Sequence, residues 1–126
     1  MTAPDRPTDR IVFKILAARE WAAAEATGAY AGSADDARDG FIHLSTAAQL
    51  AGTASKHFAG KPGLVLVAFV AETLGGKLVW EPSRGGALFP HLYAALPAAL
   101  AVWQAPLPLD AGGIPVIPAL PEALGS

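Results

Sequence analysis

Residues 39–49 read Asp-Gly-Phe-Ile-His-Leu-Ser-Thr-Ala-Ala-Gln and combine turn, strand and helix signals in one short stretch. The Asp39-Gly40 pair favours a turn, and the β-branched and aromatic residues that follow favour a strand. Thr46, with Gln49 three positions later, has the form of a capping box, which opens a helix. The stretch therefore predicts a strand that leads directly into a helix.

His43 and Ser45 lie at the exit of this predicted strand. Because alternate side chains of a strand point to the same face, we expect His43, Ser45 and Phe41 to share one surface. Such a surface can form one wall of a pocket. A histidine in an apolar strand is also compatible with a structural role, in which its ring only satisfies neighbouring polar groups.

The elements on the N-terminal side are a strand and a helix. Residues 11–16 are apolar apart from one lysine and predict the first strand. Residues 17–27 are strong helix formers, with Trp21 and Ala24 spaced for a buried stripe and Gly28 as the stop signal.

Lys14 is the unusual member of the first strand, because its neighbours are apolar. A lysine in this position can extend from the edge of a sheet into water, or it can project into a polar pocket. We favour the edge position from the strand pattern alone.

The rest of the chain contains further helical and extended stretches. Residues 30–38 predict a connection with a helical turn starting at Ser33, and residues 47–59 predict the second main helix, ending at Gly60. Residues 64–70 are continuously apolar, which is typical of a central strand covered on both faces.

Three further segments complete the predicted domain. Residues 77–81 predict a short strand, and residues 82–88 predict a flexible excursion that carries Arg84 between it and the next motif. Residues 100–107 predict a last strand, which we place at a sheet edge because Pro106 lacks a backbone N–H group.

Residues 89–93 read Phe-Pro-His-Leu-Tyr and form the second dense motif. Pro90 fixes its own backbone and biases Phe89 towards an extended conformation. His91 and Tyr93 then share one face of a stiff segment. Rigid presentation of polar side chains is what a binding site requires.

Composition limits the classes of protein to which the chain can belong. It has 126 residues, of which 52% are hydrophobic and 16% charged, so it is expected to fold as one domain. Cysteine is absent, which excludes a disulfide framework, thiol catalysis and cysteine metal sites. The net charge of −2 provides no electrostatic footprint for nucleic acid.

The predicted organisation is a single domain with two flanking segments. Residues 1–10 are polar and contain no apolar signal-peptide core, and residues 108–126 form a tail rich in proline and glycine around a domain of residues 11–107. No segment approaches the roughly 20 apolar residues of a membrane-spanning helix. We therefore expect a flexible N-terminal segment and a soluble, cytoplasmic protein without a membrane partner.

The motifs together resemble a known family. Trp21, residues 39–46, residues 64–67, Trp80-Glu81 and residues 89–93 occur in the order and spacing of the bacterial and plant family called domain of unknown function 952 (DUF952). The order of elements also resembles the RNA 2'-phosphotransferases of the ADP-ribosyltransferase-like superfamily. This second resemblance implies an α+β fold with split or mixed β-sheets, two main helices and a ligand cleft between the sheets.

The second resemblance also implies site residues. Lys14 matches the place of a basic residue, often histidine, on the first strand, and His43 and Ser45 match the second motif. Glu81 and His91 are both candidates for the third motif, which is often a glutamate. The implied ligand is NAD-like or contains ADP-ribose, and the implied activity is that of an ADP-ribosyl- or phosphotransferase-like enzyme.

The residues suggest a role for each side chain with such a ligand. A cation at Lys14 would orient a phosphate or ribose, His43 would hydrogen-bond a ribose hydroxyl, and Glu81 would stabilise positive charge as a glycosidic bond breaks. His91 and Tyr93 would hold the base or the nicotinamide. The expected ligand-binding residues also include Ser45, Arg84 and Phe89.

Two other classes of function remain open from the sequence. His43, His91 and Glu81 have the composition of a metal site with two histidines and one carboxylate. Alternatively, the protein is a non-catalytic ligand-binding or interaction module, in which His43 and His91 are structural. The expected partner is a small-molecule or nucleotide ligand.

Overall fold

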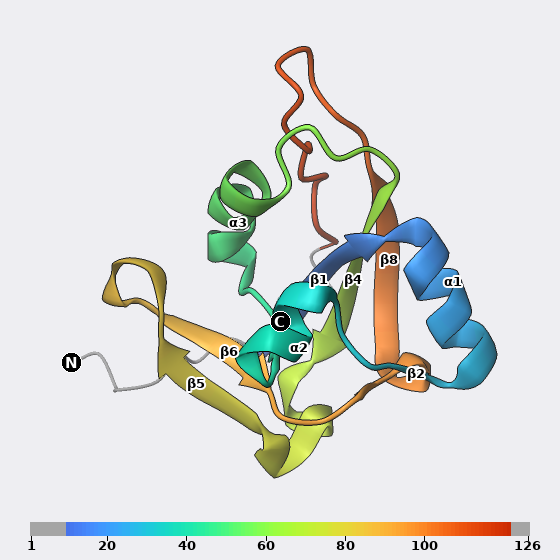
Figure 1. Ribbon diagram of the computed structural model, residues 1–126, viewed down its shortest axis with the longest axis vertical. Coiled ribbons are helices and arrows are strands. Elements are labelled where there is room, and N and C mark those ends of the chain that lie inside the picture. Colours follow the sequence, from blue (N-terminus) through green and yellow to red (C-terminus); the bar gives the residue numbers. More distant parts are fainter. Residues whose placement is uncertain (1–9, 122–126) are drawn as a thin grey trace.

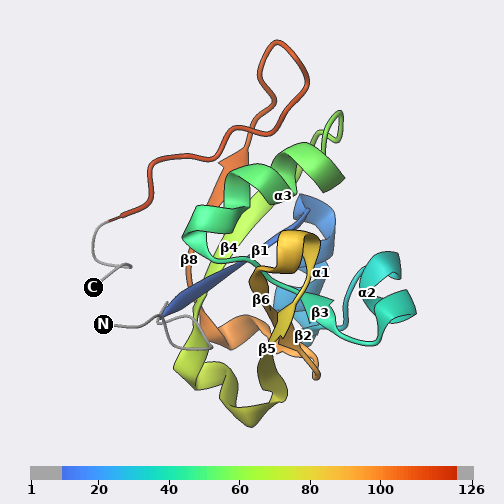
Figure 2. The same ribbon diagram turned by 90° about the vertical axis from the view of Figure 1, so that its left-hand side faces the viewer.

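The computed structural model describes residues 10–121, which form an α+β fold with split sheets (Figures 1 and 2). The main sheet has the order β1-β4-β8, and a second sheet has the order β3-β6-β5. These strands are β1 (Ile11–Ala17), β3 (Ile42–His43), β4 (Leu64–Val70), β5 (Leu78–Pro82), β6 (Leu88–Leu92) and β8 (Ala101–Leu107). A two-stranded sheet pairs β2 (Ala29–Tyr30) with β7 (Leu96–Pro97).

The α-helices are α1 (Ala18–Thr27), α2 (Ala34–Asp39) and α3 (Leu50–His57). Short 3-10 segments cover Ala47–Gln49, Ala71–Lys77, Arg84–Gly86 and Ala98–Leu100. Within residues 10–121, none of the helices has the length and apolar character needed to cross a membrane.

Strand β4 lies at the centre of the main sheet, as its apolar sequence predicts. Its side chains Val67 and Phe69 belong to the core on the side of α1, where Trp21 meets Phe69 edge-to-face at 6.1 Å between ring centroids. Leu66 belongs to the core on the side of α3, which contributes Leu50. Figure 1 shows the sheet between these two helices.

The expectation of mixed sheets is wrong, because every strand pairing within residues 10–121 is antiparallel. The chain leaves β1, enters the second sheet as β3 and only then returns as β4. Strand β4 runs antiparallel to β1, so the connection between them is not a parallel crossover unit.

The stretch 41–45 is not one regular strand, because it crosses between the two sheets. Ile42 and His43 pair with β6, opposite Leu92 and His91. Ser45 instead exchanges both backbone hydrogen bonds with Phe13 of β1, with N···O distances of 2.8 and 2.9 Å. We call residues 41–45 the crossing segment.

The predicted capping box after the crossing segment is confirmed. The Thr46 backbone N–H donates to Gln49 Oε1 at 2.9 Å. The helix starts with a 3-10 turn, continues as α3 and ends at His57, two residues before the predicted end. The capping box thereby fixes the start of this helix at Thr46, the residue that follows Ser45.

Strand β8 lies at the edge of the main sheet, as Pro106 in its sequence predicts.

The structure describes the two flanking segments in part. Residues 1–9 and 122–126, on which part of the predicted flexible segment and tail fall, lie outside the described residues.

Candidate functional site

A cavity of about 150 Å³ lies beside the crossing segment. Its lining comes from β1, α2, the crossing segment, α3 and β6, and so from both main sheets. Five of the sequence-predicted site residues line it: Lys14, His43, Ser45, Phe89 and His91. The other lining residues are Phe13, Ile15, Ser33, Asp35, Asp36, Arg38, Asp39, Leu44, Thr53, His57, Phe58 and Ser83.

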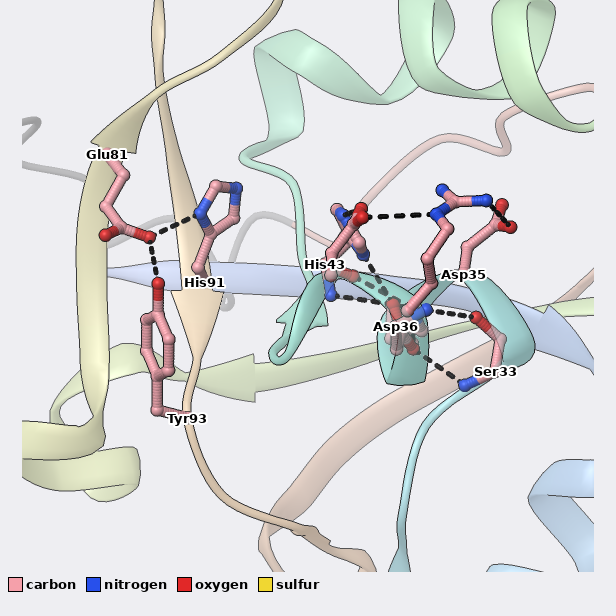
Figure 3. Close-up of polar contacts among 10 residues, drawn as sticks. Ser33, Asp35, Asp36, His43, Glu81, His91 and Tyr93 are labelled. Atoms are coloured by element: carbon pink, nitrogen blue, oxygen red, sulfur yellow. Dashed lines mark hydrogen bonds and ion pairs between the residues drawn. The ribbon is translucent and has the colours of Figure 1, made fainter.

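Asp36 is the buried centre of one half of the site. Its Oδ2 accepts hydrogen bonds from Lys14 Nζ at 3.0 Å and from the Ser33 backbone N–H at 2.9 Å. Its Oδ1 lies 3.0 Å from the His43 backbone N and 2.6 Å from His43 Nδ1. Figure 3 shows these contacts converging on one carboxylate, which ties α2 to β1 and to the crossing segment.

The pKa of Asp36 reflects opposing causes. Burial raises the pKa of this carboxyl, but the hydrogen bond from His43, the charge of Lys14 and the backbone N–H groups outweigh burial and hold it well below its usual range. Asp36 is therefore a carboxylate under ordinary conditions.

The preference for Lys14 at an exposed sheet edge is wrong. Its side chain is 6% exposed, and its ammonium also donates to the His43 backbone oxygen at 3.0 Å. Burial lowers the pKa of Lys14, while the charge of Asp36 opposes that change. The lysine turns inward because the crossing segment covers that side of β1 and Asp36 provides a partner. It lines the cavity mainly as a support for Asp36.

Ser33 caps the helix that carries Asp36. The Asp36 backbone N–H donates to Ser33 Oγ at 3.1 Å, which completes a capping box with the Ser33 N–H bond to Asp36. We expect Ser33→Ala to lower the free energy of unfolding by about 1 kcal/mol, because one helix-end N–H loses its partner. Urea denaturation of wild type and variant measures this change. Equal midpoints and slopes would contradict the capping role.

His43 lies between two carboxylates. Its Nδ1 faces Asp36, and its Nε2 lies 2.9 Å from Asp39 Oδ2. The other oxygen of Asp39 accepts from Arg38 Nε at 3.2 Å, and Arg38 Nη1 donates to Asp35 at 3.1 Å. The hydrogen bond and charge of Arg38 lower the pKa of Asp39.

His91, Glu81 and Tyr93 form the second polar group of the site (Figure 3). Glu81 Oε1 lies 2.7 Å from His91 Nδ1 and accepts from the Tyr93 hydroxyl at 2.8 Å. These two hydrogen bonds, that of His91 first, lower the pKa of Glu81, and the bond to Glu81 raises the pKa of Tyr93. His91 is buried, whereas Tyr93 is exposed.

Phe41 packs between the two histidines and the tyrosine. Its ring stacks on His91 with centroids 4.0 Å apart and an interplanar angle of 20°. Its centroid is 4.7 Å from that of His43 and 5.3 Å from that of Tyr93. The two imidazole rings themselves are 5.7 Å apart. Phe41 therefore fixes the relative orientation of the two histidines.

The sequence predicts that Glu81 meets the ligand directly. In the structure, however, Glu81 does not line the cavity. It lies on β5 and reaches only the far nitrogen of His91 and the Tyr93 hydroxyl. Tyr93 also lies outside the lining. The side chain of Arg84 lies outside the described part of the structure.

Ser45 and Phe89 line the cavity where the sequence places them. The Ser45 hydroxyl is 3.0 Å from the Thr53 hydroxyl of α3, so one donates to the other. Phe89 is buried on β6, two residues before His91. Together they form part of the cavity wall.

Asp36 and Asp39 are the site residues that sequence reasoning missed, whereas Phe41, expected on the pocket wall, packs against the two histidines outside the cavity lining. A signal for Asp36 was present, because Ser33 followed by an acidic residue three positions later has the form of a capping box. Its contacts with Lys14 and His43 span 22 and 7 positions of the sequence. No local pattern encodes contacts of that kind.

The geometry does not gather the residues of the predicted two-histidine metal site. Glu81 contacts His91 and Tyr93, whereas His43 contacts Asp36 and Asp39. Across the part of the chain that the structure describes, no group of three histidine or acidic side chains is arranged to hold a metal ion.

Comparison with known proteins shows the family. A family model described as "Protein of unknown function (DUF952)" matches residues 15–104. The chain belongs to the DUF952 family. The match confirms the first resemblance read from the sequence and covers every motif that carried it.

Solved structures similar to this DUF952 chain come from the protein CC0527 of Caulobacter crescentus. Its crystal structure is 52% identical, with a TM-score of 0.82, and the match covers 84% of this chain and 93% of that one. Its solution NMR structure is 52% identical, with a TM-score of 0.75 and coverage of 83% and 90%. The comparison with curated proteins gives no match.

Proposed function

We propose that the cavity binds the ribose unit of an NAD-like or ADP-ribose-containing ligand and that its two histidine–carboxylate pairs serve group transfer on that ligand. The observation that carries the proposal is the pair of imidazoles, 5.7 Å apart on one cavity wall, each fixed at Nδ1 by a carboxylate. A carboxylate on one nitrogen orients the ring and determines which nitrogen faces a ligand.

The two rings are prepared for different tasks. The Glu81 carboxylate accepts a hydrogen bond from the N–H at His91 Nδ1 in the tautomer that leaves the lone pair of Nε2 to accept a proton from a ligand hydroxyl. Both nitrogens of His43 face carboxylate oxygens, so the ring is positioned to donate a hydrogen bond rather than to accept one. One acceptor ring beside one donor ring suits acid–base chemistry on a ribose hydroxyl and a group attached next to it.

The cavity volume limits what is enclosed. About 150 Å³ is the size of a cavity that holds one six-membered ring. A ribose or a nicotinamide ring therefore fits inside, and the remainder of a dinucleotide lies along the opening. Ser45 and Thr53 place hydroxyls beside the enclosed ring, and Phe13 and Phe89 supply the apolar surface.

The roles of Glu81 and Lys14 in this proposal differ from those first expected. Glu81 acts through His91, because its carboxylate contacts the ring and not the cavity. Lys14 holds Asp36 and thereby His43. The resemblance of the order of elements to the ADP-ribosyltransferase-like superfamily, read from the sequence, is the reason for the choice of ligand.

Isothermal calorimetry with NAD, ADP-ribose and a 2'-phosphorylated oligonucleotide tests the proposal. We expect wild type to bind at least one of the three and His91→Ala to bind it at least about tenfold more weakly, as loss of one ligand hydrogen bond predicts. Glu25→Ala, on the exposed side of α1, is the control and should bind as wild type does.

The results also distinguish the proposed function from that of a non-catalytic module. If wild type binds none of the three ligands, the proposal fails. If, in addition, His43→Ala and His91→Ala each lower the free energy of unfolding by about 1–3 kcal/mol, the histidines are structural groups of a non-catalytic module. An exposed site histidine, such as His43, is expected to cost little stability when replaced.

A further inference from the structure

We propose that the carboxylate of Asp39 occupies a phosphate subsite at the opening of the cavity, and that a phosphate of the ligand replaces it on His43 and Arg38. The inference rests on the proposed function, because it assigns a place to the pyrophosphate of an ADP-ribose-containing ligand. It also predicts properties of His43 that are measurable without any ligand.

The inner side of His43 is fixed. Asp36 is 2% exposed and contacts both the ring Nδ1 and the backbone N of His43. Lys14 and Ser33 hold that carboxylate from other directions. A ligand therefore meets a ring whose position is set by buried contacts before binding, which reduces the cost of ordering the site.

The outer side of His43 is exchangeable. The Asp39 side chain is 35% exposed and the His43 side chain 38% exposed, so solvent reaches the contact between them. Asp39 is the last residue of α2, directly before Gly40, whose φ of 88° ends the helix. Rotation of the Asp39 side chain into water disturbs no buried contact and exposes Nε2 of the ring.

The two donors around Asp39 match a phosphate group. His43 Nε2 lies 2.9 Å from one oxygen of Asp39, and Arg38 Nε lies 3.2 Å from the other. Two donors directed at two oxygens of one anion also suit two oxygens of a phosphate. Asp35 holds Arg38 from the far side through Nη1 and keeps the guanidinium near the opening.

The position agrees with the size of the cavity. Arg38, Asp39 and His43 belong to the lining, so the subsite adjoins the space for one ring. A ribose in that space has its phosphate one or two bonds away. The negative charge of Asp39 at present balances Arg38, and an incoming phosphate restores the same balance when Asp39 turns away.

Chemical modification tests the inference without a ligand. Diethyl pyrocarbonate acylates an imidazole nitrogen that has a free lone pair, and peptide mass spectrometry resolves the 3 histidines of the chain. We expect His43 in Asp39→Ala to react about two- to fivefold faster than in wild type, which is the factor that loss of an exposed pair predicts. Rates at His57 and His91 in the same digest are the internal references.

Calorimetry with inorganic pyrophosphate, ADP-ribose and adenosine tests the ligand class. We expect Asp39→Ala to bind pyrophosphate and ADP-ribose about three- to tenfold more tightly than wild type, with adenosine unchanged, since only the phosphates compete with the carboxylate. Asp39→Asn, which keeps the size of the side chain, should give a gain of the same sign. Addition of Arg38→Ala should remove the gain.

Glu25→Ala removes the same charge far from the cavity and is the matched control. Equal pyrophosphate affinity in wild type and Asp39→Ala, equal reactivity of His43, or the same gain in Glu25→Ala overturns the inference. These results are distinct from failure of the proposed function. Wild type that binds pyrophosphate but neither NAD nor ADP-ribose retains the phosphate subsite and loses the proposed ligand.

Discussion

Replacement of Asp36 by asparagine is expected to lower the free energy of unfolding by about 3–5 kcal/mol, the usual cost of removing one partner from a buried ion pair. Lys14 and Asp36 have side chains that are 6% and 2% exposed, so water cannot take the place of the lost carboxylate. The cost is a large part of a typical stability of about 5–15 kcal/mol. Guanidinium denaturation at neutral pH measures it.

The neighbouring Asp35 provides the matched control for this prediction. It lies on the same helix and pairs with Arg38, but its side chain is 66% exposed. Asp35→Asn is therefore expected to change the free energy of unfolding by no more than about 1 kcal/mol. Similar losses for both variants would show that the buried pair does not determine the effect.

A double variant separates the lost charge partner from the other contacts of Asp36. Lys14→Met combined with Asp36→Asn leaves no buried charge unpaired, so it should recover part of the loss. The remaining loss reports the contacts of the carboxylate with Ser33 and His43. A double variant no more stable than Asp36→Asn alone would contradict the assignment of the loss to Lys14.

Acid is expected to destabilise the protein as pH falls from about 5 through the range in which unfolded aspartate titrates, near pH 3.9. The pKa of Asp36 is depressed in the folded state, because the hydrogen bond from His43 and the charge of Lys14 outweigh the effect of burial. The unfolded chain then binds the proton at a higher pH than the folded chain does. Stability from this carboxylate is complete above the unfolded pKa and is lost as pH falls towards the folded pKa.

Denaturation curves at a series of pH values between about 7 and 3 test this dependence. The double variant of Lys14 and Asp36 lacks the titrating group and should lose less stability over the same interval. Glu81 also has a lowered pKa, but it is partly exposed to solvent and remains in both proteins, so it does not account for the difference. Parallel curves for the two proteins would show that another group controls acid unfolding.

Much of the framework could be predicted from local patterns. The strand at residues 64–70 is central because an unbroken apolar run must be covered on both faces, and β4 meets that condition. Helix α1 buries Trp21 and Ala24 and ends at Gly28, as its spacing and glycine predict. These features depend on period and turn chemistry, which neighbouring residues carry.

The sequence also predicted in part which residues line the cavity. His43 and His91 face each other across β3 and β6, and both line the cavity. The sequence offered two stiff motifs with one histidine each, but it did not contain their register. The register arises when β3 pairs with β6, and that pairing sets the 5.7 Å between the rings.

The sequence by itself determined the family, the α+β class that its resemblance implies, the order of the longer elements, and the presence of His43 and its capped helix in residues 39–49. Tertiary structure alone decided that this stretch crosses between two sheets, that Lys14 turns inward and that Asp36 fixes His43. The physical reason is that a buried charge is stable only where distant segments supply its partners. Those partners meet only after the chain has folded.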